Sequence, residues 1–416
     1  MYEQTFTQST FRYLRVAFLW IFVSFYSFSS ACTTAVISGK FTASGRPMLW
    51  KVRDTEAYEN VMKRYTAHQW EYVGLVNTTD TLGVQIWGGW NEKGFAIMNS
   101  ASFNVNAGYK GGFIDQEGFF MHQALKECKT IADFENLLNS RPKPMGLAAH
   151  FGVIDAEGGA AFYEVNNETW TKFDANDEKV APRGYVLRTN YSQTGKEGEG
   201  LGFIRCQTAH LLFNEVSVGE LRIETLMQDF SRSTVHPVLK ADYRKTYSRL
   251  PAKGAMVTSD DLICRYGTSS TIAIEGVNAR KNEKPVHTTG WVQIGLPFVS
   301  VTLPMWCGVE LPQGLVAPAM GAESAFSAKS MELKKQIFPL WAQSDGYHYL
   351  AIDKLFNADK TGYTQRIEAV EKDIFSIAEQ ARQVWRSEKT VPDEWKSERI
   401  VAYLNDLVSA FYAELK

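Results

Sequence analysis

The sequence predicts an α+β protein whose first 300 residues are rich in strands and whose last part is helical. Two observations predict this class: short β-like runs recur up to residue 303, and helical segments interrupt them without alternating strictly. Strict alternation would indicate a doubly wound parallel sheet, so this order argues against one. It fits two packed, largely antiparallel sheets between helical layers.

Residues 1–31 contain, in order, the three regions of a secretory signal peptide: basic residues, an apolar run and a cleavage site with small residues. Arg12 and Arg15 precede an apolar run of 13 residues, and small residues occupy the third and first positions before Cys32. This pattern predicts cleavage between Ala31 and Cys32, and therefore an exported protein, periplasmic or extracellular. The run is short against the roughly 20 residues needed to span a bilayer.

The mature chain would begin with Cys32. A cysteine with a free α-amine combines a nucleophile and a weak base, since the usual pKa values are about 8.5 for the thiol and roughly 7.7–8.0 for the amine. The terminus is therefore a candidate active site. Three other interpretations of Cys32 are an uncut anchor, a lipoprotein cysteine acylated on its thiol and amine, and a disulfide partner or buried thiol.

The segment after Cys32 reads as a hairpin that ends in Lys51-Val52-Arg53-Asp54. Its strands are expected at 32–40 and 48–51, with a turn at 44–47. Further strands are expected at 71–76, 84–87, 95–98, 151–154, 160–165, 271–274 and 291–303.

Helices are expected at 119–128 and 131–138, and Thr130 with Asp133 forms a capping pair for the second of these. A third is expected at 206–212. A stretch containing Pro and Gly, 311–321, precedes a tail in which two apolar stripes, 367–385 and 400–411, keep helical spacing. The stripes are interpreted as core-facing surfaces, with a homo-oligomer interface as the alternative. The chain is thus divided into a signal peptide (1–31), a main domain (32–325) and a helical extension packed on it (326–416).

The hairpin that begins at Cys32 resembles the start of the choloylglycine hydrolase, penicillin acylase and isopenicillin N acyltransferase group, the N-terminal-nucleophile hydrolases also called linear amide C-N hydrolases. Members open with Cys-Thr or a close variant, and then place a cation three positions before an aspartate. Lys51 and Asp54 fill those places. Members more often have arginine at the first place, so the bidentate fork of a guanidinium is lost at Lys51, and Arg53 is the candidate to supply it.

Two further segments carry the resemblance. Residues 88–100 contain the group's Asn-Glu-x-Gly turn and a strand, and in relatives an asparagine shortly after this strand stabilises the tetrahedral oxyanion; Asn99 is the nearest candidate. Residues 183–191 end in Thr-Asn, which makes Asn190 the preferred oxyanion or substrate-amide donor. Arg205, near a helix start, matches an arginine that lies at the active centre in relatives. For each asparagine, the ordinary alternative is a capping or turn residue.

The resemblance, which covers 32–306, implies a four-layer αββα sandwich and a hydrolase or acyltransferase that cleaves a linear amide through a Cys32 thioester. In that scheme a cation beside the sulfur favours thiolate, and Asp54 holds the α-amine. Maturation is by signal peptidase or by self-cleavage. The alternatives are a cysteine dipeptidase of the same superfamily and a lipid-anchored binding protein acylated on Cys32. A salt bridge at the end of a hairpin is the ordinary interpretation of Lys51 and Asp54.

Charge and composition limit the partners. Removing residues 1–31 takes away two arginines and one glutamate, which changes the formal charge from −2 to −3, and no basic patch predicts nucleic-acid binding. After residue 31 no stretch approaches transmembrane length, so no stable membrane insertion is expected. The expected partner is a small-molecule amide.

No cofactor or metal is expected. There is no glycine-rich phosphate loop, and the isolated histidines, including His122, His150 and His210, follow no metal-ligand spacing. The four cysteines after Cys32 are widely spaced without a CxxC motif, which argues against structural zinc and leaves both disulfides and buried thiols open.

Overall fold

The computed structural model describes residues 31–111, 115–281, 283–388 and 390–415. The predicted signal peptide lies outside the described residues except for Ala31. Among the helices that are described, none is both long enough and apolar enough to cross a membrane.

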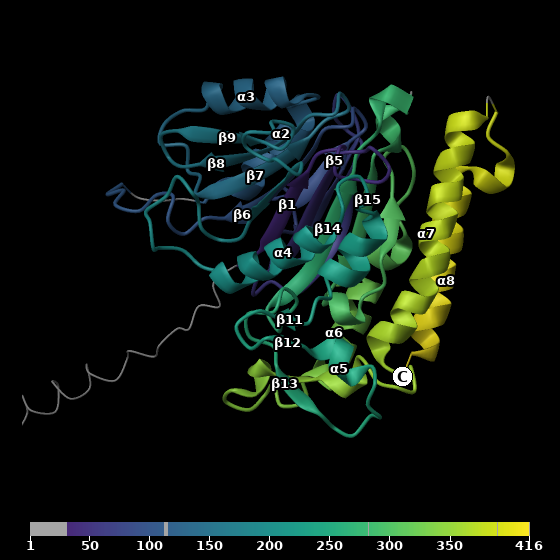
Figure 1. Cartoon of the computed structure of the whole chain (residues 1–416). Helices are drawn as coiled ribbons and strands as arrows, with labels where there is room; N and C mark the ends of the chain where they lie inside the picture. The colour runs from purple at the N-terminus through teal and green to yellow at the C-terminus, as the bar shows by residue number, and fades with distance from the viewer. Residues whose placement is uncertain (1–30, 112–114, 282, 389, 416) are drawn as a thin grey trace, which may run out of the picture.

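Two antiparallel sheets form the centre of the fold (Figure 1). The six-stranded sheet has the order β10-β1-β2-β14-β15-β16, and the seven-stranded sheet runs from β3 to β9 in sequence order. The first consists of β1 (Thr33–Ile37), β2 (Met48–Asp54), β10 (Tyr185–Arg188), β14 (Thr268–Glu275), β15 (Thr289–Ile294) and β16 (Leu303–Met305). The second consists of β3 (Asn60–Tyr65), β4 (Tyr72–Asn77), β5 (Gly88–Asn91), β6 (Ala96–Ala101), β7 (Ala149–Ile154), β8 (Ala160–Val165) and β9 (Trp170–Asp174).

The two sheets pack face to face, with β1 and β2 against β6 and β7. Helices α2 (Glu117–Glu127) and α3 (Ile131–Ser140) cover the outer face of the seven-stranded sheet, while α4 (Phe203–Glu215) packs on β1 and β10. Because both faces of the central strands are covered, every residue of β1, β2 and β14 is buried. The predicted α+β class and four-layer αββα sandwich are confirmed.

The C-terminal helices lie beside the six-stranded sheet, as the yellow end of the chain shows in Figure 1. They are α6 (Ala325–Ile337), α7 (Tyr363–Ser387) and α8 (Ser397–Glu414). Ile367, Ile374, Leu404 and Val408 are fully buried in the same apolar cluster as β1 and β2, so the two stripes face the core. The shorter elements are β11 (Val235–His236), β12 (Ala241–Asp242), α5 (Tyr243–Tyr247), β13 (Met256–Thr258), β17 (Tyr349–Ala351) and a π-helical turn (Thr225–Phe230).

Local chemistry explains where the predicted elements differ from the observed ones. The strand expected at 84–87 is wrong: the strand is β5, where a Cβ on Gly89 would lie 2.4 Å from the Val73 carbonyl oxygen, so only glycine permits this pairing. The run 291–303 is broken by Gly295, at φ 88°, and a 3-10 turn at Pro297–Val299. The Thr130–Asp133 capping box is confirmed.

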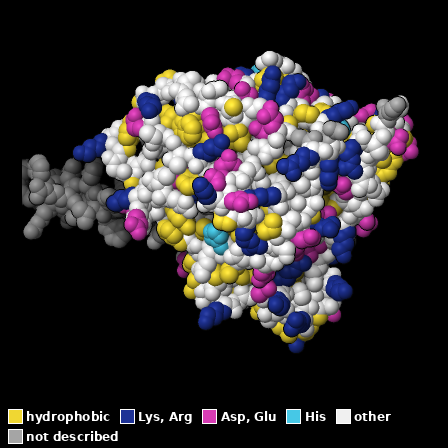
Figure 2. Space-filling model, turned by 45° about the horizontal axis from the view of Figure 1, so that its top comes forward, with side chains coloured by type: hydrophobic (Ala, Val, Ile, Leu, Met, Phe, Trp, Pro, Cys, Tyr) yellow, Lys and Arg dark blue, Asp and Glu magenta, His cyan; other side chains and the backbone are white. Residues whose placement is uncertain are grey.

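Two further features concern the thiols and the surface. All five cysteines are free and buried. On the face shown in Figure 2, basic and acidic side chains are intermingled.

A buried ion pair ties α7 to the strand core. Two nitrogens of Arg232 donate to the carboxylate of Glu371, each at 2.7 Å, and both side chains are fully buried. Glu371 also accepts from the amide and hydroxyl of Thr302, at 2.7 and 2.6 Å. The position of α7 therefore depends on one carboxylate with several donors.

We expect Glu371→Ala to lower the free energy of unfolding by about 3 kcal/mol, because it removes the bidentate partner of the buried Arg232 charge and leaves only Glu368, 3.9 Å away. Asp373→Asn, at an exposed position of the same helix, should change it by less than about 0.5 kcal/mol. Urea unfolding measures both variants. Equal stability of the two would contradict this role for Glu371.

Candidate active site

The backbone of Cys32 is held by two of the predicted site residues. Its nitrogen donates to Asn190 Oδ1 at 2.9 Å, and its carbonyl oxygen accepts from Arg205 Nη1 at 2.6 Å. Cys32 is 5% exposed and directly precedes β1. In the described chain Ala31 precedes it, so this nitrogen is a peptide N–H.

Arg205 joins three segments at this point. Nη2 donates to Asn190 Oδ1 at 2.9 Å, and Nη1 also donates to Thr33 Oγ1 at 3.0 Å. Burial and the neighbouring Arg265 lower the pKa of Arg205 to about 10, so the guanidinium stays charged at neutral pH. The structure thus places Arg205 at the centre, as the resemblance implies.

Both polar atoms of the Asn190 side-chain amide form hydrogen bonds. Oδ1 accepts from Cys32 and Arg205, and Nδ2 donates to the Ala101 carbonyl at 2.9 Å. These contacts hold the backbone of Cys32, and the role of Asn190 as oxyanion donor stays a prediction.

Lys51 is the centre of a buried polar chain. Its Nζ donates to the Trp87 carbonyl and to Asn99 Oδ1, both at 2.7 Å, while Asn99 Nδ2 donates to Glu117 Oε2 at 2.6 Å. Asn99 therefore lies between an ammonium and a carboxyl group, and its predicted contact with an oxyanion stays a prediction. Sequence reasoning missed Glu117, which reads as an ordinary acidic residue in the first turn of α2.

Burial shifts the pKa values of Lys51 and Glu117 so that the neutral form of each side chain is favoured. It lowers the pKa of Lys51 to about 8, although attraction to Cys32 acts in the opposite direction. Burial, reinforced by Asp115, raises the pKa of Glu117 to about 8. Both groups therefore change charge in the same narrow pH range.

Arg53 and Asp54 extend the site along β2. The Arg53 guanidinium lies over the Trp87 ring, 5.1 Å from its centroid, and Nη1 donates to Asn60 Oδ1 at 3.1 Å. Among the described residues it makes no bidentate pair with a carboxylate, so the fork proposed for it is not observed. Burial lowers the pKa of Arg53 to about 10, and attraction to Cys32 opposes this shift.

The carboxylate of Asp54 is held from β14 and the loop before it. Oδ1 accepts from Thr268 Oγ1 at 2.6 Å, and Oδ2 forms an ion pair with Arg265. Burial raises the pKa of Asp54, whereas Arg265 and Arg205 act to lower it. Its contact with a free α-amine stays a prediction.

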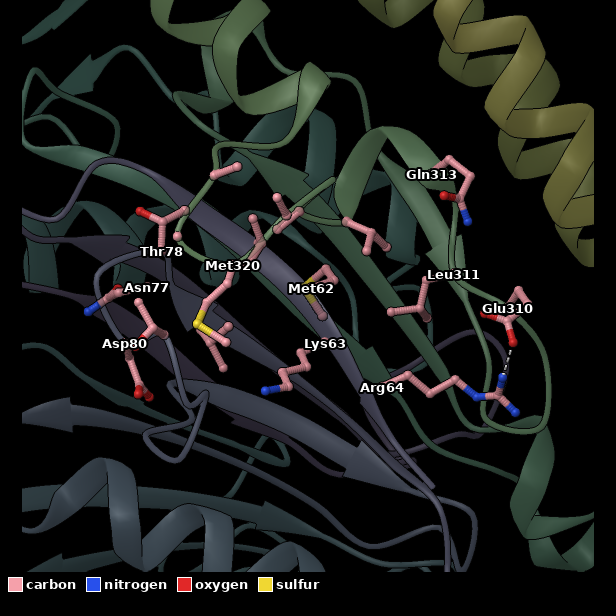
Figure 3. A pocket seen from close by; sticks show the side chains of 18 residues that line it. Met62, Lys63, Arg64, Asn77, Thr78, Asp80, Glu310, Leu311, Gln313 and Met320 are labelled. Carbon is pink, nitrogen blue, oxygen red and sulfur yellow. Dashed lines mark hydrogen bonds and ion pairs between the residues drawn. The ribbon is translucent and has the colours of Figure 1, made fainter. Parts of the chain in front are cut away.

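A separate groove lies along β3, the edge strand of the seven-stranded sheet. It has a volume of about 430 Å³, with Met62, Leu311 and Met320 among its lining, and the Arg64–Glu310 ion pair lies at one end (Figure 3). None of the six predicted site residues lines it.

Comparison with known proteins gives structural similarity alone. No family model and no curated protein sequence matches the chain. The chain is similar in structure to a Caenorhabditis elegans N-acylethanolamine-hydrolyzing acid amidase ortholog, with 14% identity, a TM-score of 0.38, and coverage of 58% of this chain and 92% of that one.

Two further similar structures are bacterial. Penicillin V acylase from Agrobacterium tumefaciens is 13% identical, with a TM-score of 0.39 and coverage of 66% of this chain and 86% of that one. A variant of the conjugated bile acid hydrolase from Clostridium perfringens is 11% identical, with a TM-score of 0.37 and coverage of 66% and 92%.

The contact between Gly202 and Arg205 predicts a sensitive position. Gly202 has φ 86°, and a Cβ there would lie 2.3 Å from Arg205 Nη2. We expect Gly202→Ala to displace Arg205 from Cys32 and to lower the rate of Cys32 alkylation by about 10-fold, because the variant moves away a positive charge that favours the reactive thiolate. Mass spectrometry of iodoacetamide-treated protein measures this rate.

The matched control is Gly198→Ala. Gly198 also has a positive φ, 75°, but no atom lies within 4 Å of its Cβ position, so it carries the backbone strain without the collision. Equal alkylation rates in the two variants would sink the proposed role of Gly202.

The raised pKa of Glu117 predicts a pH-dependent stability. The folded protein keeps this proton up to about pH 8, whereas the unfolded chain loses it at the usual glutamate pKa of about 4.3. The folded state thus binds more protons between these values, and stability falls as the pH rises through them. We expect Glu117→Gln to reduce this fall by an amount on the order of 1–3 kcal/mol.

Urea unfolding at pH 5 and pH 8 checks this prediction. Glu127→Gln, an exposed position on the same helix, serves as the control and should keep the pH dependence of the parent protein. A Glu117→Gln protein with the parent's pH dependence would show that Glu117 is ionised in the folded state.

Proposed function

We propose that this protein is an amide hydrolase or acyltransferase that uses Cys32 as its nucleophile, on linear amides other than peptide bonds. The observation that carries the proposal is the convergence of Asn190 and Arg205 on the backbone of Cys32, with Lys51 and Arg53 electrostatically coupled to its sulfur. Positive charge beside a sulfur favours the nucleophilic thiolate. A buried cysteine with an ordinary structural role needs no such arrangement.

In the first step the Cys32 thiol gives its proton to the α-amine, and the sulfur attacks the amide carbonyl carbon. The carbon–sulfur bond forms, and the carbonyl electron pair moves to the oxygen, whose negative charge needs nearby donors. When the tetrahedral intermediate collapses, the carbon–nitrogen bond breaks and the departing nitrogen takes the proton. The products are a thioester on Cys32 and a free amine.

In the second step water attacks the thioester, releasing a carboxylic acid and restoring the thiol. A second amine in place of water makes the reaction an acyl transfer. Asp54 is assigned the role of holding the α-amine, because a carboxylate that accepts from the amine tunes its basicity.

Maturation follows from the need for a free amine. We propose export of the chain and cleavage between Ala31 and Cys32, by signal peptidase or by self-cleavage. Burial of Cys32 argues against the lipid-anchored alternative. Cys32 is 5% exposed, and its backbone nitrogen and carbonyl oxygen are both hydrogen-bonded to neighbouring side chains, which leaves little space for attached acyl chains.

Two forms of the chain test the function: one beginning at Cys32 and one beginning at Ala31. On a panel of penicillin V, acyl-homoserine lactones, conjugated bile salts, N-acyl amino acids and dipeptides, only the Cys32 form should be active, because Ala31 turns the amine into a neutral amide. Cys32→Ser should lower the rate by orders of magnitude, and Cys128→Ala should leave it unchanged. Full activity with Ala31 in place, confirmed by intact mass, would refute the role of the amine.

A further inference from the structure

Helix α6 brings a buried lysine to the candidate active site. Lys334 is 2% exposed, and its Nζ has no hydrogen-bond acceptor among the described residues. It interacts electrostatically with Asp54 and with Cys264. A buried ammonium is costly unless an acceptor or a counter-charge compensates it, so this position requires an explanation.

Two tyrosine rings enclose the ammonium. Nζ lies 3.5 Å from the centroid of the Tyr58 ring and 4.2 Å from that of Tyr266. Ring faces attract a cation, but they accept no conventional hydrogen bond, so the three donors of the ammonium stay available for an anion. Tyr58 belongs to the short segment 55–59 between β2 and β3, where every residue is at least partly exposed, and Tyr266 is also partly exposed. Rotation of the Tyr58 ring would open Nζ to a ligand.

The surrounding charge is also unbalanced. Five basic side chains lie in the network around Cys32 and Asp54, namely Lys51, Arg53, Arg205, Arg265 and Lys334. Burial lowers the pKa of Lys334 to about 7, so its amine is only partly charged at neutral pH, and an anion beside it favours the charged form. The carboxyl groups in the same network are Asp54 and Glu117, with Asp261 acting on Arg205 and Asp115 acting on Glu117. Burial keeps Glu117 protonated up to about pH 8, so the centre has an excess of positive charge at neutral pH. Such a centre attracts and stabilises an anionic ligand.

We propose that Lys334 binds an anionic group of the substrate, a carboxylate, on the Asp54 side of the candidate active site. This inference rests on the proposed amide-cleaving function and names the class of amide that is cleaved: one that carries a carboxylate near the scissile bond. Lys334 is then a substrate-binding residue, contributed by the predicted helical extension.

Matched pairs of amides test this inference. The two members of each pair differ only in whether one carboxylate is free or methylated: an N-acyl aminobenzoate against its methyl ester for the amine side, and a glutaryl anilide against its methyl ester for the acyl side. For one of the two pairs, we expect the parent protein to prefer the carboxylate. Lys334→Met should reduce that preference in kcat/KM by about 10- to 100-fold, the effect of losing a hydrogen bond to a charged group.

Two control variants separate binding from structure. Lys335→Met, at an exposed position of the same helix, should keep the preference, and Lys334→Arg should restore most of it because it retains the charge. A purely structural lysine would instead change kcat/KM for the acid and its ester equally. That result, or an unchanged preference in Lys334→Met, would overturn the inference.

Binding to a protein that cannot turn over distinguishes the two proposals. In the Cys32→Ser background, calorimetry should show tighter binding of the carboxylate than of its ester, and loss of this difference with Lys334→Met. If the parent protein cleaves no amide but this difference persists, the proposed reaction fails and the anion site stands. Equal binding of acid and ester refutes the site.

Discussion

The buried guanidinium of Arg205 is the interaction on which the geometry of the candidate site depends. It donates to the carbonyl of Cys32, to Thr33 Oγ1 and to Asn190 Oδ1, and so connects the start of β1, the end of β10 and the first turn of α4. Asn190 Oδ1 accepts from both Arg205 and the nitrogen of Cys32. A movement of any one of the three therefore displaces the other two. Cys32 is therefore held by side chains from the segment just after β10 and from the first turn of α4.

A lysine at position 51 suits its surroundings better than an arginine would. Two single acceptors, the Trp87 carbonyl and Asn99 Oδ1, each lie 2.7 Å from the compact ammonium, and within the described part of the chain no carboxylate forms an ion pair with it. A planar guanidinium gains most from a bidentate partner, which this position lacks. The carboxyl group of Glu117 is connected to Lys51 through the side chain of Asn99. The charge of Lys51 thus stays available to Cys32, with which it interacts electrostatically.

The sequence predicts the central layers well because local patterns encode them. Apolar runs, the Thr130–Asp133 capping box and the two helical stripes of the tail all depend on near neighbours in the chain. The Cys32 motif indicates Lys51 and Asp54 through spacing, but contacts such as that of Asn99 with Glu117 depend on the packing of α2 against β6. The residues that sequence reasoning missed, Glu117 and Lys334, stand in ordinary helical contexts. Only the fold shows that each is buried beside other charges.

The C-terminal helices pack into the same apolar cluster as the strands that follow Cys32. Residues of α7 and α8 share one apolar cluster with β1 and β2, and Glu371 fixes α7 through the buried charge of Arg232. Helix α6 packs on β15 and carries Lys334, whose charge is coupled to Asp54. Because β15 pairs with β14, and β14 pairs with the β2 strand that carries Lys51, Arg53 and Asp54, a shift of α6 reaches the site through two strands. Changes that loosen the tail should therefore alter the electrostatics of the site before they unfold the sheets.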